Sequence, residues 1–198
     1  MEITKRIILA SQSPRRRELF GQLGLPFEVL VSDAEETITS SEPSFVTEEL
    51  SKQKAEVVAQ GIEDGIIVGA DTVVSVDGEI LGKPVDRADA KRMIQSLQGR
   101  SHMVYTGVTI ICKEKGKTVQ ERTFSEGTKV YVASMNEEEI AAYIDTKEPY
   151  DKAGAYGIQG IFSKHIKKIE GDYFNVVGLP VHRLYEEMKP AKLISKSS

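Results

Sequence analysis

The sequence predicts an α/β fold in which helices flank a mixed β-sheet. Two observations lead to this prediction. Strand-like and helix-like segments are interspersed without strict alternation, and several neighbouring strand-like segments are separated by two turn residues, which indicates antiparallel hairpins. The 198 residues, 40% hydrophobic and 28% charged, suit one domain with a sizeable core. We therefore expect a single domain over residues 1–190 and a flexible polar tail at 191–198.

The N-terminal elements are predicted from an apolar run and from helix-start signals. Residues 5–10 form a buried strand, and a helix begins at Pro14, because proline suits the first helical position and Ser13 can cap it. The helix should end at Gly21 or Gly24. A second strand over 27–32 and a long helix over 41–60 follow. For that helix we expect Ser44 as the N-cap and an apolar stripe of Phe45, Leu50, Val57 and Val58.

The remaining elements are marked by turn and cap residues. Three two-residue turns predict hairpins: Asp77-Gly78 between two short strands within residues 66–84, Lys115-Gly116 between long strands at 102–114 and 117–133, and Glu170-Gly171 within residues 165–178. Three more helices are expected, over 87–98 with Asp86 as the cap and Gly99 as the stop, over 134–149 with a capping box of Ser134 and Glu137, and over 180–189.

Charge and cysteine content exclude several classes of protein. A net charge of -4 argues against a general nucleic-acid or membrane binder, because both usually carry a broad basic excess. Cys112 is the only cysteine, so an intrachain disulfide and a thiolate metal site are impossible, and we expect it to be buried on its strand. The first residues do not show the hydrophobic region and cleavage site of a signal peptide, and no apolar run approaches the length of a membrane span, so we expect neither. We therefore expect a cytoplasmic protein without nucleic-acid or membrane partners.

Three consecutive arginines open the first predicted helix. On a helical wheel Arg16 projects near the middle of the apolar stripe, Arg15 lies at its edge and Arg17 points away. A helix start attracts anions, Ser11 and Ser13 add hydroxyl donors, and the guanidinium fork suits phosphate oxygens. We therefore predict a phosphate site at Arg15 and Arg16. The alternative is a solvated basic helix start that pairs with surface acids, and neither a P-loop nor a Rossmann fingerprint is present.

Two further charges interrupt apolar patterns. Asp71 directly follows a buried strand-like run, and an aspartate there needs a positive partner, either a divalent metal or a lysine. Lys83 lies at the same open end of the predicted hairpin, so the two side chains can meet, and a purely structural ion pair is the alternative. Lys54 lies toward the apolar side of the second helix, where it either reaches out to water or points into the same cleft.

The segment 151–160, DKAGAYGIQG, is too rich in glycine for regular structure. Backbone can approach a ligand closely there, and Gln159 offers both a donor and an acceptor to the edge of a base. A plain connecting loop is the alternative. The three histidines, His102, His165 and His182, are scattered, so we treat them as structural or surface residues.

Taken together, the motifs LASQSPRRREL, KQKA, GADTVV, LGKP, DKAGAYGIQG and VVGLP resemble, in the same order, those of the Maf family of nucleoside triphosphate pyrophosphatases. The resemblance runs from about residue 7 to residue 185. It implies a fold like that of the inosine-triphosphate pyrophosphatases, with two lobes and a cleft on an elongated sheet. It also implies hydrolysis of a nucleoside triphosphate to the monophosphate and pyrophosphate with a divalent metal, Mg²⁺ or Mn²⁺, by a homodimer.

Residue by residue, the resemblance assigns catalysis to Asp71, Lys54 and Lys83, phosphate binding to Ser11, Ser13, Arg15 and Arg16, base selection to Arg16, Thr72 and Gln159, and metal binding to Asp71 and Glu36. The arginine pair and the AYGIQG loop resemble the branch that acts on dTTP and UTP, with modified pyrimidine nucleotides as further candidates, in sanitation of the nucleotide pool. The branch that favours 7-methyl-GTP differs at these motifs. Asp71 would then be the general base, alone or through the metal. The alternative is a nucleotide-binding regulator of cell division and septum formation without essential catalysis.

Overall fold

The computed structural model describes residues 5–31, 33 and 35–189, so the predicted tail at 191–198 lies outside the described residues. Its strands are β1 (Ile7–Ala10), β2 (Glu28–Val29), β3 (Gly65–Val76), β4 (Glu79–Leu81), β5 (Ser101–Glu114), β6 (Lys117–Val132) and β7 (Ile166–Glu170). They form a seven-stranded sheet in the order β2-β1-β3-β5-β6-β7, and β4 pairs with β3 off this path.

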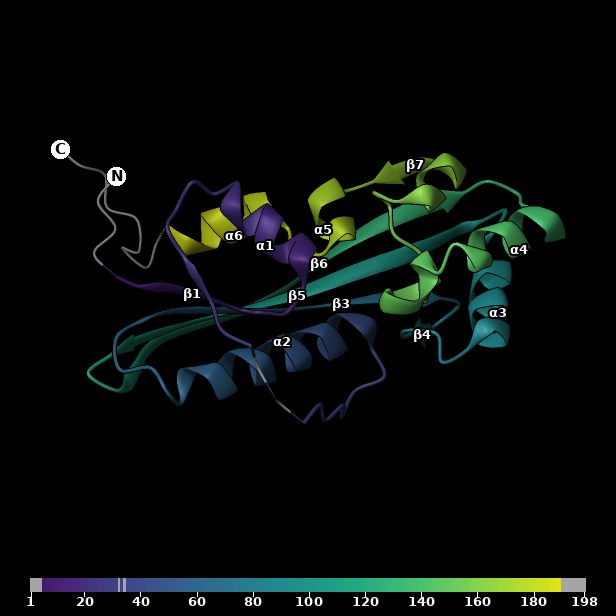
Figure 1. Ribbon diagram of the computed structural model, residues 1–198. Helices are drawn as coiled ribbons and strands as arrows, with labels where there is room; N and C mark the ends of the chain where they lie inside the picture. The colour runs from purple at the N-terminus through teal and green to yellow at the C-terminus, as the bar shows by residue number, and fades with distance from the viewer. Residues whose placement is uncertain (1–4, 32, 34, 190–198) are drawn as a thin grey trace.

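The sheet is mixed because its two parts are built differently. β1 pairs in parallel with both β2 and β3, and a helix makes each crossover, as parallel neighbours require. β3, β5 and β6 pair antiparallel, and Figure 1 shows these long strands extending through most of the molecule. The two hairpin turns have positive φ at both residues, 52° and 82° at Asp77 and Gly78 and 49° and 75° at Lys115 and Gly116. The predicted turns are therefore confirmed.

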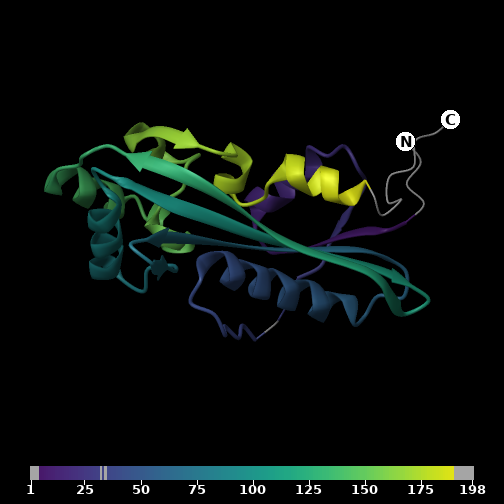
Figure 2. The same cartoon turned by 180° about the vertical axis from the view of Figure 1, so that it is seen from behind.

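Helices cover both faces of the sheet and one of its ends (Figures 1 and 2). They are α1 (Pro14–Gly21), α2 (Pro43–Ala59), α3 (Arg87–Leu97), α4 (Glu137–Asp145), α5 (Tyr173–Val177) and α6 (Val181–Met188). α2 lies on one face, α1, α5 and α6 lie on the other, and α3 and α4 pack together at the far end. The predicted fold class, a mixed sheet flanked by helices, is confirmed. None of the described helices has the length and apolarity needed to cross a membrane.

α2 packs very closely on the sheet because two glycines lie beneath it. A Cβ atom on Gly107 would lie 2.2 Å from the carbonyl oxygen of Thr47, and one on Gly69 would lie 2.4 Å from that of Ser51. The residues of α2 at this contact are small, and Thr47, Ser51 and Ala55 are each 0% exposed. The position of α2 is thus set by small residues of the helix on glycines of the sheet.

This close packing explains why half of the predicted apolar stripe of α2 is wrong. Leu50 and Val58 are buried as predicted, but Phe45 is 59% and Val57 is 38% exposed. The helix turns its small residues, and not its largest apolar ones, toward the two glycines. Hydrophobicity alone therefore misplaces the buried face by part of a turn.

Two predicted caps are also wrong, each by two residues. Pro43 takes the first position of α2, so Glu42 is the N-cap and Ser44 lies inside the helix. In α4 the capping box joins Asn136 and Glu139, whose side chains bond each other's backbone N–H groups at 2.8 and 2.9 Å, in place of the Ser134 and Glu137 pair.

The third predicted hairpin is wrong. β7 ends at Glu170, and no strand of the described chain returns beside it after Gly171. Instead the Asp172 carboxylate accepts a hydrogen bond from the N–H of Phe174 at 2.8 Å, which caps the short helix α5. A turn signal followed by an aspartate thus begins a helix.

The buried apolar residues of the described chain form four clusters, and the two largest lie toward the two ends of the long strands. One cluster surrounds β1, α1 and α6 and includes Leu9, Phe20 and Leu184. The other surrounds β4, α3 and α4 and includes Ile94 and Ile140. The strands β3, β5 and β6 run through both of these clusters, and we call the parts of the molecule around them the two lobes. Cys112 is buried on β5, as predicted.

Candidate active site

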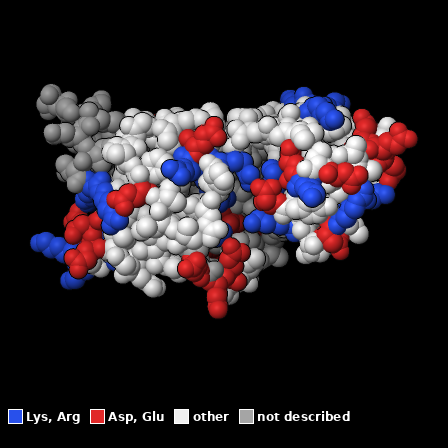
Figure 3. Space-filling view, in the orientation of Figure 1, with Lys and Arg blue, Asp and Glu red and all other residues white. Residues whose placement is uncertain are grey.

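A cleft of about 750 Å³ lies between the lobes. Its walls are the junction of β1 and α1, the middle of β3, the segment 151–160 and the end of α5. All ten predicted site residues line it, namely Ser11, Ser13, Arg15, Arg16, Glu36, Lys54, Asp71, Thr72, Lys83 and Gln159. Figure 3 shows basic side chains gathered near the middle of this face, with acidic side chains beside them.

The start of α1 faces the cleft. Ser13 is the N-cap, as predicted, and its hydroxyl accepts a hydrogen bond from the N–H of Arg16 at 3.4 Å. Ser11 Oγ accepts one from the N–H of Ser13 at 3.2 Å, which tightens the turn between strand and helix. The positive end of the helix dipole and two hydroxyl groups therefore lie at one wall of the cleft.

Arg16 is held from behind by two neutral acceptors. Its Nε donates to the carbonyl oxygen of Gly178 at 2.8 Å, and its Nη2 donates to Thr72 Oγ1 at 2.9 Å. Burial lowers the pKa of Arg16 from its ordinary value, and the nearby Asp71 carboxylate opposes this shift. Because neither hydrogen-bond partner is charged, the guanidinium keeps its positive charge available to the cleft.

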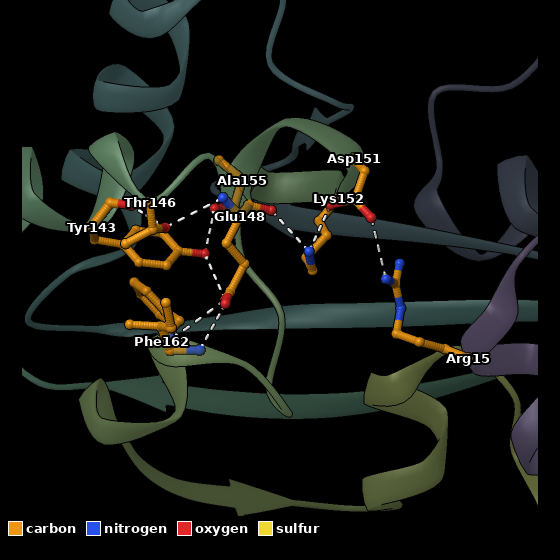
Figure 4. A network of polar contacts seen from close by, with 9 residues as sticks. Arg15, Tyr143, Thr146, Glu148, Asp151, Lys152, Ala155 and Phe162 are labelled. Carbon is orange, nitrogen blue, oxygen red and sulfur yellow. Dashed lines mark hydrogen bonds and ion pairs between the residues drawn. The ribbon is translucent and has the colours of Figure 1, made fainter.

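Arg15 and Arg17 occupy the positions that the helical wheel predicts. Arg17 is exposed, whereas Arg15 lies at the cleft wall and pairs with Asp151 at 3.4 Å (Figure 4). The Asp151 side chain is 65% exposed, so this ion pair is weak. A phosphate group can therefore replace Asp151 as the partner of Arg15.

Lys54 lies between two carboxylates. Its ammonium group contacts Asp71 Oδ1 and lies 3.0 Å from Glu36 Oε1. The side chains of Lys54 and Asp71 are only 20% and 14% exposed, so water screens their pair poorly. Asp71 lies inside β3, which continues through it as one strand of 12 residues and not as the short strand predicted. The predicted positive partner of this aspartate is therefore a lysine, Lys54.

Lys83 does not make the predicted pair with Asp71. The register of β4 on β3 ends at Val74 and Leu81, so the chain leaves the sheet before it reaches Lys83. Lys83 stays exposed at the cleft wall, and among the described residues the ion pair of Asp71 is with Lys54. The two lysines thus supply positive charge at different parts of the cleft.

The segment 151–160 presents Gln159 at the cleft on a folded support. Gln159 is exposed, while Tyr156 is buried with its hydroxyl 2.6 Å from His102 Nε2. Burial raises the pKa of Tyr156, and burial together with nearby Arg100 lowers the pKa of His102 to about 4. Both groups therefore remain neutral near pH 7. The other two histidines differ, because His165 is buried and His182 is exposed.

Sequence reasoning named Thr72 but missed its partners behind Arg16, which are Thr106, Asn175 and the carbonyl group of Gly178. The hydroxyl groups of Thr72 and Thr106 lie 2.9 Å apart, and Thr106 donates to the carbonyl oxygen of Asn175 at 2.9 Å. This chain of hydrogen bonds joins β3 and β5 to α5, whose end supplies the Gly178 carbonyl. A buried threonine such as Thr106 and backbone carbonyl groups carry no charge or periodicity signal, so the sequence offered no way to find these partners.

Comparisons with known proteins place the chain in a family. A sequence model of the Maf-like protein family matches residues 6–191. The chain is 51% identical over 196 residues to a dTTP/UTP pyrophosphatase of Agathobacter rectalis, covering 92% of this chain and 96% of the relative. It is 53% identical over 189 residues to a dTTP/UTP pyrophosphatase of Bacillus cereus, and the match covers 95% of this chain and 91% of the relative. The structure of the Staphylococcus aureus Ham1 protein aligns with 94% of this chain and 100% of its own at a TM-score of 0.54 and 15% identity, which indicates a shared fold alone.

Proposed function

This chain belongs to the Maf-like protein family, and we propose that it is a nucleoside triphosphate pyrophosphatase acting on dTTP and UTP. The observation that carries the proposal is one cleft in which Arg15, Arg16 and Lys83 share the walls with the shielded pair of Lys54 and Asp71. The names of the two relatives support pyrimidine triphosphates as substrates. Removal of these nucleotides, and of modified forms of them, would serve sanitation of the nucleotide pool.

The start of α1 binds the phosphate chain in this proposal. Arg16 is fixed by Gly178 and Thr72 with its charge unneutralised, and Arg15 exchanges Asp151 for phosphate oxygens. The guanidinium fork and the free N–H groups of the helix start both suit a polyanion.

Asp71 is the proposed general base. Its carboxylate takes a proton from a water molecule that attacks the α phosphorus, the bond from the α phosphorus to the bridging oxygen breaks, and pyrophosphate leaves. Lys54 contacts this carboxylate and so restrains its orientation. Lys83 and the two arginines stabilise the negative charge that develops on the departing pyrophosphate.

The residues at Asp71 fit a hard divalent cation, Mg²⁺ or Mn²⁺. Asp71 and Glu36 both direct a carboxylate oxygen at the Lys54 ammonium, so the two oxygens already converge on one positive charge. Magnesium is commonly held by one or two carboxylates together with substrate phosphates, which agrees with the absence of a larger ligand cluster among the described residues. When bound, the cation would screen the phosphates and lower the pKa of a coordinated water.

Base selection is proposed for Gln159, Thr72 and Arg16. Gln159 extends from the segment 151–160 at the cleft wall, where its amide can pair with the edge of a pyrimidine. Thr72 acts through Arg16, which it holds by a hydrogen bond.

The proposal includes a cytoplasmic homodimer. Cys112 is buried and unpaired, which supports a reducing compartment. The dimer is expected from the family resemblance, and light scattering coupled to size-exclusion chromatography tests it.

Product analysis of UTP turnover tests the proposed reaction. With Mg²⁺ or Mn²⁺ the protein should convert UTP to UMP and pyrophosphate, and dTTP should behave in the same way. Formation of UDP and inorganic phosphate would contradict cleavage between the α and β phosphates. Stabilisation by UTP without any product would instead favour the alternative, a nucleotide-binding regulator.

A further inference from the structure

We propose that Glu148 is a positioning residue for base selection, because it closes the loop that presents Gln159 to the cleft. This inference rests on the proposed function and adds to it a residue that lines no part of the cleft. Glu148 opens a 3₁₀ turn over Glu148–Asp151, and its side chain reaches across to the other end of the loop at Phe162 (Figure 4).

The carboxylate of Glu148 joins both ends of the loop and α4. Its Oε2 accepts a hydrogen bond from the N–H of Ile161 at 2.8 Å. Its Oε1 accepts from the N–H of Phe162 at 3.5 Å and from the hydroxyl of Tyr143 at 3.3 Å. The Tyr143 hydroxyl also contacts the carbonyl oxygen of Ala155 at 3.1 Å, so the middle of the loop is tied to the same point. One anionic group thus organises three donors.

The carboxylate lies close against the backbone of the loop. A Cβ atom on Gly160 would lie 2.3 Å from Glu148 Oε1, and one on Gly157 would lie 2.7 Å from Lys152 Cε. The ammonium of Lys152 donates to the carbonyl oxygen of Glu148 at 2.8 Å. Gln159 stands between these two glycines, so its backbone position follows from where Glu148 and Lys152 hold them.

The same network reaches the phosphate wall. The ammonium of Lys152 contacts Asp151 Oδ1 at 2.6 Å, and Asp151 Oδ2 pairs with Arg15 (Figure 4). The loop that presents Gln159 is therefore held by Glu148, and it borders Arg15, the arginine proposed to bind the triphosphate. A carboxylate suits this place because both of its oxygens can accept N–H groups, whereas an amide would turn an NH₂ group toward one of these donors.

The test compares Glu148→Gln with Glu138→Gln, an exposed glutamate of α4, as the matched control. The measured quantity is the ratio of kcat/KM for UTP to that for CTP, with Gln159→Ala as the reference for a lost base contact. We expect Glu148→Gln to narrow this ratio by about tenfold, mainly through a higher KM for UTP, while Glu138→Gln keeps the wild-type ratio. An unchanged ratio would overturn the proposal, whether kcat/KM stays the same for both nucleotides or falls equally for both.

Two additions keep the outcome decisive. Calorimetry with the α,β-imido analogues of UTP and CTP gives the ratio of their dissociation constants, which reports base selection without turnover. If the wild-type protein releases no pyrophosphate, the proposed function is contradicted, but the effect of Glu148→Gln on base selection can still be measured by binding. Gly160→Ala, whose Cβ would displace the Glu148 carboxylate, should narrow the ratio in the same way. If Glu148→Gln does not fold, as judged by circular dichroism, the result for Gly160→Ala decides alone.

Discussion

Asp71 combines strong shielding with a place at the cleft wall, which is unusual for a carboxylate and suits a general base. Asp71→Asn keeps the size of the side chain but removes its ability to accept a proton. We expect kcat for UTP to fall by about 10²–10⁴-fold while nucleotide binding stays measurable, because Arg15 and Arg16 are unchanged. Single-turnover kinetics measures the loss of kcat, and calorimetry measures the remaining nucleotide binding.

The matched control for this variant is Asp77→Asn, which removes an exposed carboxylate at the far turn of the same hairpin. It should turn over UTP at the wild-type rate. Near-normal hydrolysis by Asp71→Asn would exclude Asp71 as the base.

His102 makes the stability of the fold depend on pH. Its pKa is lowered from 6.5 to about 4 by burial, so the unfolded chain takes up a proton at a higher pH than the folded chain does. Stability is therefore complete above pH 6.5 and is lost as the pH falls toward 4, by about 2 kcal/mol between pH 7.5 and pH 5. Urea unfolding of the wild type and of His102→Gln should show this loss in the wild type and a flatter profile in the variant.

His182→Gln is the control for this experiment, because it removes an exposed imidazole and leaves the buried His102 in place. Parallel profiles for the wild type and His102→Gln would show that His102 does not cause the loss.

At the scale of single residues, the sequence predicted side chains whose charge conflicts with their surroundings. Arg16 stood out because it points at an apolar stripe, and Asp71 because it follows a buried strand. Glu148 and Asp151 did not stand out, because an acid near a turn is usually a solvated surface group. Only their contacts with Phe162 and Arg15 connect them to the cleft, and the role proposed for Glu148 depends on these contacts.

At the scale of elements, α2 carries Lys54, and the distance between α2 and the sheet sets the position of that lysine. Gly69→Ala would place a Cβ atom 2.4 Å from the carbonyl oxygen of Ser51, a backbone atom that cannot move without the helix. We expect the free energy of unfolding to fall by about 1–3 kcal/mol, and kcat to fall with it because Lys54 shifts relative to Asp71. Thermal unfolding and pyrophosphate release measure the two effects.

Gly21→Ala tests whether any added methyl group has this effect. Its Cβ would meet no atom within 4 Å, so stability and turnover should stay at the wild-type level. Equal behaviour of the two variants would contradict the role given to the contact of α2 with the sheet.

Local signals predicted elements where one residue type decides the backbone, as at Pro14 for α1 and at Asp77-Gly78 for the turn to β4. Local signals failed where tertiary contacts decide which face of a helix is buried or which element forms. The buried face of α2 follows from glycines in other strands, which no periodicity within the helix reveals. The helix α5 follows from a cap at Asp172 after a turn signal that equally suits a hairpin.

At the scale of the whole molecule, the cleft is assembled from chain segments as distant as Ser11 and Gly178. Parallel pairing of β1 with β3 brings the start of α1 beside Asp71, and the segment 151–160 returns to line the same cleft. The net charge of -4 gives no sign of this basic cleft, because acidic residues elsewhere outnumber its cations. The sequence thus predicted residues that line one cleft, while their mutual contacts depend on the topology.

A bound triphosphate should therefore join the two lobes. We expect the α,β-imido analogue of UTP to slow amide hydrogen exchange both at the start of α1 and in residues 153–160, because its phosphates bind one wall and its base the other. At 100 times its dissociation constant it should stabilise the fold by about 2.7 kcal/mol. Hydrogen-exchange mass spectrometry checks the pattern, with tripolyphosphate as the control that should protect α1 and leave 153–160 unchanged. Protection confined to α1 with the full analogue would contradict a site shared between the lobes.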